Sequence, residues 1–370
     1  MVPSGRTVGR GAHPSTTRDV LVSDGPAKRY DGRDEPILEP GLPIVDPHHH
    51  FYDLPHTRYM FEDYLSDVYA GHNVVASTYV ATQAMVRIDG PEVLRPLGEV
   101  EFANGVAAMS ASGNYGPCRV CAAIVGFADL TLGDQVADLL DRCLATAPDR
   151  FRGIRQSSLD APNDAVFRYV LSTARPVQGI LRHPAFPDGF RHLAPRGLTF
   201  DASIFHHQAS ELAALADAFP DTTIVLNHMG IALGMDMDED GRAAVFRQWQ
   251  AGIAKIAERH NVVCKVGGLG MPFWGLGFET RPDAVASSEL AMAWAPWIEG
   301  AIEVFGPDRC MMESNYPPDA RSCGWVPLWN ALKSILHGYS PDEKAALFHG
   351  TAARIYRIAM PPDTAGTSAS

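Results

Sequence analysis

The sequence lacks several features that would assign it to common protein classes. It has no run of about 18 apolar residues, so we expect no membrane-spanning helix. Basic residues are in the minority: 31 Lys and Arg stand against 43 Asp and Glu, and the net charge of −12 argues against a nucleic-acid partner. A phosphate-binding loop is also missing, because Gly267–Gly275 has neither the glycine spacing nor the Lys-Ser/Thr ending of one.

Cysteine is scarce, with six residues in 370, several of them within apolar runs. We therefore expect reduced, buried thiols and a cytoplasmic protein. Cys118 and Cys121 have C-x-x-C spacing, but no second pair follows, which favours buried thiols over a zinc or redox site. No apolar stretch follows Arg6 and Arg10, so we expect no secretory signal.

The chain divides into one long domain and two tails. Residues 1–40 are rich in Gly, Pro, Ser and Arg without periodicity, which predicts a flexible N-terminal arm, and residues 359–370 form a similar C-terminal tail. Residues 41–358 hold eight short apolar runs, each followed by a segment of helical period. The runs are Leu42–Asp46, Val74–Val80, Val120–Phe127, Phe151–Arg155, Leu198–Ile204, Thr223–Asn227, Val262–Val266 and Arg309–Met312.

Eight strand–helix repeats predict an α/β protein with a (β/α)8 barrel, the TIM-barrel fold, in a single domain. A doubly wound open sheet is the competing fold. It usually has a glycine-rich fingerprint after its first strand, whereas here that position reads His48-His49-His50. The apolar stripes of the helical segments, such as Trp294 and Trp297, are interpreted as core packing.

Histidines gather at the predicted carboxyl ends of three strands, where barrel enzymes place their chemistry. His48 and His50 should share one side of the first strand because side chains alternate, with His49 opposite. His207 and His228 follow the fifth and sixth strands. Four such imidazoles suit one divalent metal ion, but neutral histidines can also polarise a carbonyl without an ion, and both hypotheses stay open.

Polar residues elsewhere complete a candidate pocket. Glu313 and Asn315 should point inward from the eighth strand, where Glu313 is the first candidate to activate water. Asp319 is the second candidate, since Asn315 cannot take a proton at neutral pH. Arg155 is interpreted either as a clamp for a substrate carboxylate or lactone oxygen or as part of a structural ion pair. Further candidates for substrate binding are Gln83, Gln156, Trp274 and Tyr316.

Several motifs, taken in order, resemble the amidohydrolase superfamily, in particular its lactonase-like branch. The resemblance runs from Ile44 to about Ile358. The motifs that carry it are Asp46–Asp53, His207-Gln208, Asn227–Gly230, Val266–Met271, Glu313–Pro317 and Leu347–Tyr356.

The resemblance implies a distorted TIM barrel that hydrolyses lactones or cleaves related C–O, C–N or C–C bonds. It implies further that His48, His50, His207 and His228 bind one divalent metal ion, zinc or manganese, although some lactonases of this branch work without metal. The chain departs from the pattern at four positions. Asn315 stands where the superfamily usually has aspartate, and Ala81, Gln156 and Ala320 stand where the branch has an acid, a His and a Lys.

Three hypotheses of function follow. The first is a hydrolase that opens a small lactone or a cyclic ester or amide. The second is a non-hydrolytic enzyme on the same barrel: a decarboxylase, or a cyclase, isomerase or lyase of secondary metabolism. The third is a catalytically silent binding protein. Each has a small molecule as ligand, with no nucleic acid or membrane as partner, and the sequence leaves a homo-oligomer open.

Overall fold

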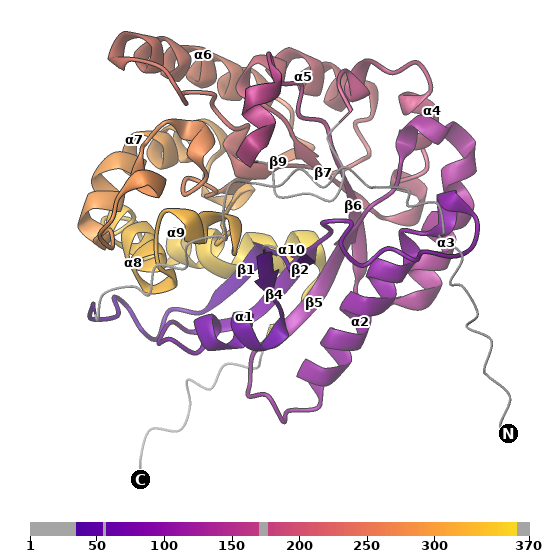
Figure 1. Ribbon diagram of the computed structural model, residues 1–370, viewed down its shortest axis with the longest axis horizontal. Coiled ribbons are helices and arrows are strands. Elements are labelled where there is room, and N and C mark those ends of the chain that lie inside the picture. Colours follow the sequence, from indigo (N-terminus) through magenta and orange to yellow (C-terminus); the bar gives the residue numbers. More distant parts are fainter. Residues whose placement is uncertain (1–34, 55–56, 170–176, 361–370) are drawn as a thin grey trace, which may run out of the picture.

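The computed structural model describes residues 35–360 except 55–56 and 170–176, so most of the predicted N-terminal arm and C-terminal tail lies outside the described residues. Eight strands form one parallel sheet in the order β1-β4-β5-β6-β7-β8-β9-β10. The sheet curls into a barrel surrounded by helices (Figure 1), which confirms the predicted TIM barrel. The strands are β1 Ile44–His49, β4 Val74–Val80, β5 Arg119–Gly126, β6 Phe151–Ser157, β7 Thr199–Ser203, β8 Ile224–Leu226, β9 Val262–Val266 and β10 Cys310–Met312.

The barrel closes between its last and first strands by a short contact. The register between β1 and β4 is irregular between Asp46 and His49, around Pro47, which has no N–H to donate to a ladder. The end of β1 meets the segment that follows the last strand, β10, through a single bridge between His49 and Tyr316. The His50 N–H donates to the Tyr316 carbonyl over 2.9 Å. The histidine triplet therefore lies at the seam of the barrel.

The helices surround the barrel and cover its outer face (Figure 1). In α7 the predicted apolar stripe is buried, and Trp297 packs against Trp249 and Trp274 with ring centroids 4.8 and 4.9 Å away. This confirms core packing for that stripe. The helices are α1 Phe61–Val68, α2 Leu97–Ala111, α3 Val136–Thr146, α4 Phe186–Phe190, α5 Ala209–Ala218, α6 Glu239–Ala257, α7 Ser287–Phe305, α8 Trp325–Ile335, α9 Pro341–Ala345 and α10 Thr351–Tyr356.

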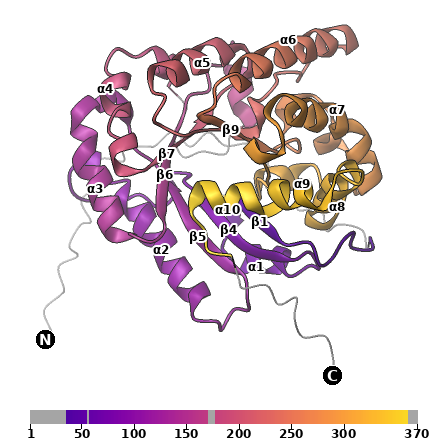
Figure 2. The same cartoon turned by 180° about the vertical axis from the view of Figure 1, so that it is seen from behind.

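Residues at the C-terminal end of the described chain fill one end of the barrel interior. Strand residues such as Val45 and Val225 form a separate apolar cluster with Tyr356 and Ile358, at and beyond the end of α10. Figure 2 shows α10, in yellow, lying across this end. The Tyr356 hydroxyl reaches the Asp201 carboxylate at 2.9 and 3.1 Å, so the last helix supplies a hydrogen bond to a buried charge within the barrel.

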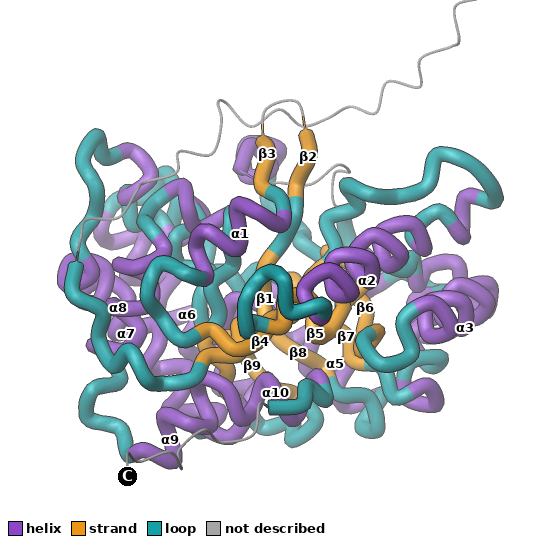
Figure 3. The backbone as a smooth tube through the Cα atoms, turned by 90° about the horizontal axis from the view of Figure 1, so that it is seen from below, coloured by secondary structure: helices purple, strands orange, loops and turns teal. Residues whose placement is uncertain are grey.

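Two local features are not evident from the sequence. A hairpin of β2 Tyr52–Leu54 and β3 Thr57–Tyr59 follows β1 and projects beyond the barrel, on the side away from α10 (Figure 3). Residues 35–40, placed by the sequence in a flexible arm, pack on α8, where Lys333 Nζ donates to the carbonyls of Leu38 and Glu39, each over 2.9 Å.

Two expectations about composition can be compared with the structure. Cys118 and Cys121 are buried, and burial raises the pKa of the Cys118 thiol to about 12, so it stays protonated at neutral pH. Among the described residues, no helix combines the length and apolar character needed to cross a membrane.

Candidate active site

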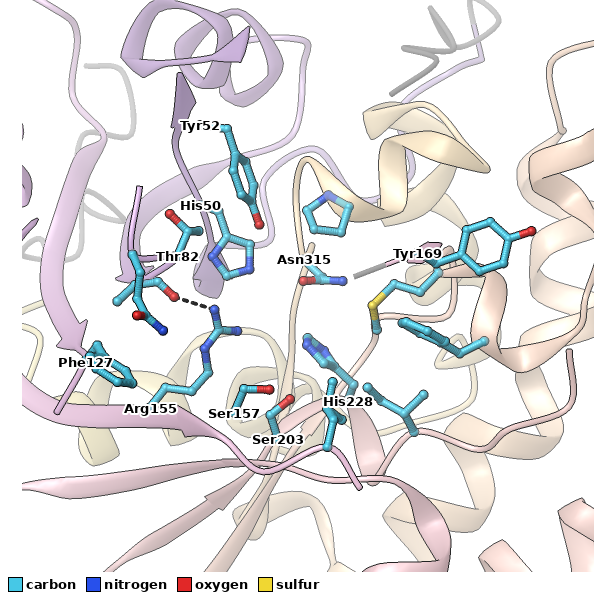
Figure 4. Close-up of a pocket in the computed structure, with 17 residues that line it drawn as sticks. His50, Tyr52, Thr82, Phe127, Arg155, Ser157, Tyr169, Ser203, His228 and Asn315 are labelled. Carbon is cyan, nitrogen blue, oxygen red and sulfur yellow. Dashed lines mark hydrogen bonds between the residues drawn. The ribbon is translucent and has the colours of Figure 1, made fainter. Parts of the chain in front are cut away.

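A cavity of about 90 Å³ opens at the carboxyl ends of the barrel strands. Figure 4 shows its lining side chains converging from different strands and loops. Within this lining, as far as the structure describes it, Arg155 is the only Asp, Glu, Lys or Arg. The lining residues are His50, Tyr52, Ala81, Thr82, Gln83, Phe127, Arg155, Ser157, Leu159, Tyr169, Ser203, His228, Ile231, Met271, Phe273, Asn315 and Pro318.

His48 and His50 face each other, as strand alternation predicts, and His50 lines the cavity while His48 is fully buried behind the lining. Their Nε2 atoms lie 3.1 Å apart, whereas His49 turns away to Ser77 and stacks on Tyr64. Burial lowers the pKa of both His48 and His50 well below 6.5, so each imidazole is neutral. A neutral imidazole carries one proton, and hydrogen bonding decides which nitrogen holds it.

The nitrogen of His50 that faces His48 carries a lone pair. His50 Nδ1 lies 2.7 Å from the Val80 carbonyl, which only accepts, so the proton of His50 is on Nδ1. His48 Nδ1 lies 3.0 Å from the Glu313 carboxylate and 3.3 Å from Lys265 Nζ. The Nε2 atoms of both rings converge on the same region, an arrangement that favours a positive charge beside them.

Arg155 brings such a charge to this region. Its Nη1 lies 3.3 Å from His48 Nε2, and its Nη2 donates to the Ala81 carbonyl. The Ala81 carbonyl thus holds the guanidinium in place. The site contains no carboxylate paired with Arg155 among the described residues, so the guanidinium is available to a substrate oxygen.

The Glu313 carboxylate lies between His228 and His48 and contacts both rings. Its Oε1 lies 2.6 Å from His228 Nδ1 and its Oε2 lies 3.0 Å from His48 Nδ1, and all three side chains are buried. Because a carboxylate accepts, His228 holds its proton on Nδ1 and presents the Nε2 lone pair to the cavity that the ring lines. Glu313 is therefore an orienting group for His228, and not itself exposed to the cavity.

The backbone around His228 is specialised for this placement. His228 lies in a short turn, Asn227–Met229, directly after β8, and has a φ of 52°. Left-handed backbone at a non-glycine residue is costly and is found preferentially at functional sites. Gly268 packs against the ring, since a Cβ at this position would lie 2.6 Å from His228 Nδ1.

Asn315 lines the cavity, whereas Asp319 lies behind it. Asn315 Nδ2 donates to Asp319 Oδ1 over 2.7 Å, and the Gly270 N–H donates to Asp319 Oδ2 over 2.9 Å. Burial raises the pKa of Asp319. With its amide nitrogen bound to Asp319, Asn315 directs its oxygen into the cavity as a hydrogen-bond acceptor (Figure 4).

A buried ion pair that the sequence analysis missed supports the site from inside the barrel. Lys265 of β9 lies 2.7 Å from Asp201 of β7, and both side chains are fully buried. Lys265 Nζ also lies 3.3 Å from His48 Nδ1, and its positive charge helps to keep that imidazole neutral. The signal was present in the sequence as a lone lysine in the apolar run Val262–Val266.

The structure does not bring His207 to the other histidines, which corrects the predicted set of four. β7 ends at Ser203, and His207 lies in the following turn, His206–Gln208, where its exposed ring faces the Asp160 carbonyl at 2.8 Å. The residue of this region that lines the cavity is Ser203. The sequence misled because the motif places a histidine near the strand end, although the chain has already turned outward toward α5.

Three of the four further candidates for substrate binding lie behind the cavity wall. Gln156 bonds to Asp129 and to the Leu130 N–H, because alternation along β6 sends it away from Arg155. Trp274 donates to the Gly268 carbonyl over 2.9 Å, and the Tyr316 hydroxyl donates to the Cys323 carbonyl over 2.8 Å. Gln83 is the candidate that lines the cavity, and the sequence did not identify other lining residues, namely Tyr52, Phe127, Ser157, Tyr169 and Met271.

The donor chemistry of the site fits a divalent ion. The Nε2 atoms of His48 and His50 converge at 3.1 Å, which is the arrangement that an ion bound by two imidazoles requires. His48, His228 and Glu313 also have ligand atoms that all lie within 4.8 Å of one another. Arg155 would compete with an ion for His48 Nε2, since its Nη1 lies 3.3 Å from that nitrogen.

Comparison with known proteins identifies relatives of this chain. The family model described as Amidohydrolase matches residues 45–358. The uncharacterized protein y4mH of Sinorhizobium fredii is 33% identical over 86% of this chain and 99% of its own length. The L-fucono-1,5-lactonase of Burkholderia multivorans is 25% identical over 86% of this chain and 97% of its own length.

Solved structures with the same fold include an amidohydrolase from Burkholderia multivorans with bound zinc. It superposes with a TM-score of 0.62 at 22% identity and covers 85% of this chain and 99% of its own. A 5-carboxyvanillate decarboxylase from Novosphingobium aromaticivorans, in complex with manganese, superposes with a TM-score of 0.55 at 14% identity over 86% and 97% of the two chains. At these identities the likeness concerns the fold.

Proposed function

The chain belongs to the amidohydrolase family, and from this premise we propose that it hydrolyses a small lactone, with His228 as general base and Arg155 polarising the carbonyl. The observation that carries the proposal is the pair of His228 and Glu313. The carboxylate accepts the Nδ1 proton over 2.6 Å and leaves Nε2 free to take a proton within the cavity. Hydrolysis needs such a base, whereas loss of carbon dioxide does not.

Arg155 is the group that binds the carbonyl oxygen. It is the only fixed positive charge among the described lining residues, and it is held by the Ala81 carbonyl with Nη1 near the floor of the cavity. As water attacks the carbonyl carbon, negative charge develops on the carbonyl oxygen. A buried guanidinium stabilises this charge, by several kcal/mol where a donor of this kind is essential.

The proton moves through His228. Nε2 accepts a proton from the attacking water as its oxygen bonds to the carbonyl carbon, and the Glu313 carboxylate stabilises the resulting imidazolium. The ester C–O bond of the ring then breaks, and the imidazolium returns the proton to the departing ring oxygen. The product is the open-chain hydroxy acid, and the base is restored.

The remaining polar groups favour a neutral, hydroxylated ring as substrate. Asn315 offers an amide oxygen, and Ser157, Ser203 and Thr82 offer hydroxyls, while the described lining contains no carboxylate. Hydroxyl and amide groups of this kind pair with the hydroxyls of a sugar ring. The relative whose name describes it as an L-fucono-1,5-lactonase supports a sugar lactone as substrate class.

A zinc or manganese ion would be held by the facing Nε2 atoms of His48 and His50 and would supply Lewis-acid polarisation of the carbonyl, while His228 stays free to act as the base.

The test is hydrolysis of a panel of sugar 1,4- and 1,5-lactones, followed by acid release in weakly buffered solution and corrected for spontaneous opening. In water enriched in oxygen-18, the carboxylate product should contain one labelled oxygen from solvent. Arg155→Lys keeps the positive charge but loses the planar guanidinium and its bidentate hydrogen bonds. We therefore expect kcat/KM to fall by about 100-fold.

The control is His260→Asn, which removes an exposed imidazole and should retain wild-type turnover. Release of carbon dioxide from a carboxylated aromatic acid, with no solvent oxygen in the product, would identify the chain as a decarboxylase instead. Full activity of Arg155→Lys on a lactone would remove Arg155 from the mechanism.

A further inference from the structure

A second cavity adjoins the first and is larger, with a volume of about 580 Å³ against about 90 Å³. Gln83 and Phe127 line both cavities. The rest of the second lining comes from the connection between β4 and α2 and from the connection between β5 and α3. These residues are Val86, Glu92, Val93, Arg95, Pro96, Asp129, Leu132 and Gln135.

The wall between the cavities is a fixed part of the structure. Gln83 has a left-handed backbone, with φ of 63°, and its N–H donates to Glu99 Oε2 over 3.0 Å. The Thr82 N–H donates to the other oxygen of Glu99 over 2.9 Å, and Glu99 is 1% exposed. A buried carboxylate of α2 therefore holds the backbone at the border, so that the Gln83 side chain and Phe127 stand between the two spaces.

The polar groups of the second cavity include a donor, Arg95, and an acceptor, Asp129. Arg95 Nε is buried and has no hydrogen-bond partner among the residues that the structure describes, although a buried donor normally has one. Asp129 Oδ1 accepts from the Thr131 N–H over 3.0 Å and from Gln156 Nε2 over 2.8 Å, which fixes the carboxylate. Gln156 follows Arg155 in β6, so one strand provides Arg155 to the first cavity and, through Gln156, fixes Asp129 of the second.

This lining favours a neutral group with several hydroxyls over an anion. Arg95 is accompanied by two carboxylates, Glu92 and Asp129, so the net charge of the lining is negative and does not attract an anionic group of a ligand. Hydroxyl groups can accept from a guanidinium and donate to a carboxylate in the same site. Val86, Leu132 and the Phe127 ring supply apolar surface for the face of a ring.

We propose that the second cavity binds a second hydroxylated ring of the substrate, attached to the lactone ring that opens at His228 and Arg155. This inference rests on the proposed lactone hydrolysis and specifies its substrate as the lactone of a disaccharide acid or a similarly substituted sugar lactone. Arg95 and Asp129 bind the hydroxyls of this ring, and Gln83 and Phe127 contact the linkage.

Binding of reaction products tests the subsite separately from catalysis. Isothermal titration with gluconate measures the first cavity alone, and titration with maltobionate, cellobionate and melibionate adds a second ring at different linkages. We expect at least one disaccharide acid to bind about tenfold more tightly than gluconate, as one or two further hydrogen bonds predict.

Two variants locate the additional affinity. Arg95→Gln removes the buried donor, and Val86→Trp fills the cavity with bulk. Each should reduce the disaccharide advantage to about twofold or less, a loss equal to a hydrogen bond or a blocked contact, while gluconate binding stays at the wild-type value. Met292→Trp adds the same bulk at a site that is 80% exposed on α7 and should change neither affinity. Thermal unfolding establishes that each variant is folded.

The outcomes separate the two proposals. A disaccharide advantage that disappears in Arg95→Gln and Val86→Trp supports the subsite, also when no lactone is hydrolysed, in which case only the proposed function fails. Equal affinity for gluconate and the disaccharide acids, or an advantage that both variants retain, overturns the subsite. No measurable binding of any disaccharide acid overturns it as well, even with rapid hydrolysis of a monosaccharide lactone.

Discussion

His228 and His207 show how backbone position determines what an imidazole can do. His228 lies in the turn directly after β8, where a φ of 52° turns its ring toward Glu313 and the cavity. His207 lies four residues beyond the end of β7, and its ring is exposed beside the Asp160 carbonyl. Both follow a predicted strand end in the sequence, but only His228 lines the cavity with a nitrogen available to water.

We therefore expect opposite results from the same substitution at these two residues. His228→Asn should lower kcat on the best lactone by 10²- to 10⁴-fold, the usual contribution of a general base. His207→Asn should keep kcat within about twofold, as is usual for an exposed side chain away from the reacting groups. Steady-state kinetics with both purified variants make the comparison, and similar losses in the two would restore His207 to the site.

A second residue-scale prediction concerns stability in acid. His72 is buried, accepts from Lys333 Nζ at Nδ1 over 3.0 Å and faces the Val326 carbonyl through Nε2 at 3.3 Å. Burial, aided by the Lys333 charge, lowers the pKa of His72 from 6.5 to about 4. The unfolded chain binds a proton below the ordinary pKa of 6.5, but the folded chain does so only near 4, so stability falls as pH drops through this window.

His72→Gln should reduce this loss, which for one group is at most about 1.4 kcal/mol per pH unit. The measurement is the free energy of unfolding in urea between pH 7 and pH 4, for the wild type and the variant. Other buried histidines, such as His49 with its pKa lowered to about 3, contribute to both slopes equally. Identical slopes would mean that His72 is not held neutral.

The sequence predicted individual residues well where a simple periodicity controls them. Alternation along the first strand separated His48 and His50 from His49, and the same rule placed Glu313 and Asn315 on one side. Roles that depend on a neighbour distant in the chain were not accessible. The sequence cannot show that the Gly270 N–H binds Asp319 across 49 residues, or that Glu313 orients His228 across 85 residues.

At the scale of elements, the loop after β9 shapes the site through one glycine. Gly268 has a φ of 70°, and its missing side chain leaves room for the His228 ring. In the Gly-rich segment after β9, Met271 and Phe273 line the cavity. Its glycines serve a packing purpose, since the ring and the loop backbone lie in direct contact.

Gly268→Ala should therefore lower activity more than stability. The added Cβ would lie 2.6 Å from His228 Nδ1 and would displace the ring, and misplacement of a catalytic group by about 1 Å costs about 100-fold in rate. Gly113→Ala is a matched control, because Gly113 also has a positive φ, 78°, but no atom within 4 Å of the added Cβ. Equal kcat in the two variants would show that the ring tolerates the contact.

The elements themselves were largely predictable, because each barrel strand is a short apolar run with turns on both sides. The predicted ends differ from the observed ends mostly by one to three residues, as in Leu198–Ile204 against β7 Thr199–Ser203. The hairpin of β2 and β3 was missed because each strand has only three residues. Such short pairs depend on tertiary contacts rather than on a local pattern.

At the scale of the whole molecule, an ion bound between His48 and His50 would lie at the seam where the first strand meets the end of the last, an arrangement that exists only in the folded barrel. Binding to the folded state alone raises the free energy of unfolding by RT ln(1 + [L]/Kd), about 2.7 kcal/mol at 100 times the Kd. Zinc should therefore raise the midpoint of thermal unfolding of the wild type.

The same protein should contain about one equivalent of zinc or manganese by elemental mass spectrometry after loading. His48→Ala/His50→Ala removes both facing imidazoles, so both the metal and the shift in unfolding should be lost. If the wild type binds no ion under these conditions, or the double variant binds as much, the metal assignment is wrong and Arg155 remains the positive group at His48.

The TIM barrel as a whole was predictable from the count of repeats, since eight strand–helix units of ordinary length leave few other arrangements. The packing of residues 35–40 on α8 was not, because it depends on Lys333 and Asn330, about 290 residues further along the chain. Local composition there indicates an arm, and only the folded barrel provides the surface that binds it.

The contact between Tyr356 and Asp201 affects how the chain can fold while it is being synthesised. A ribosome delivers all barrel strands before α10, so the Asp201 carboxylate and the apolar cluster around Val45 stay uncovered in the nascent chain. Incomplete chains that expose apolar surface are prone to aggregate and depend on chaperones. A premature stop codon between Pro318 and α10 should therefore yield a chain that cellular quality control degrades, although every residue that lines the cavity has been made.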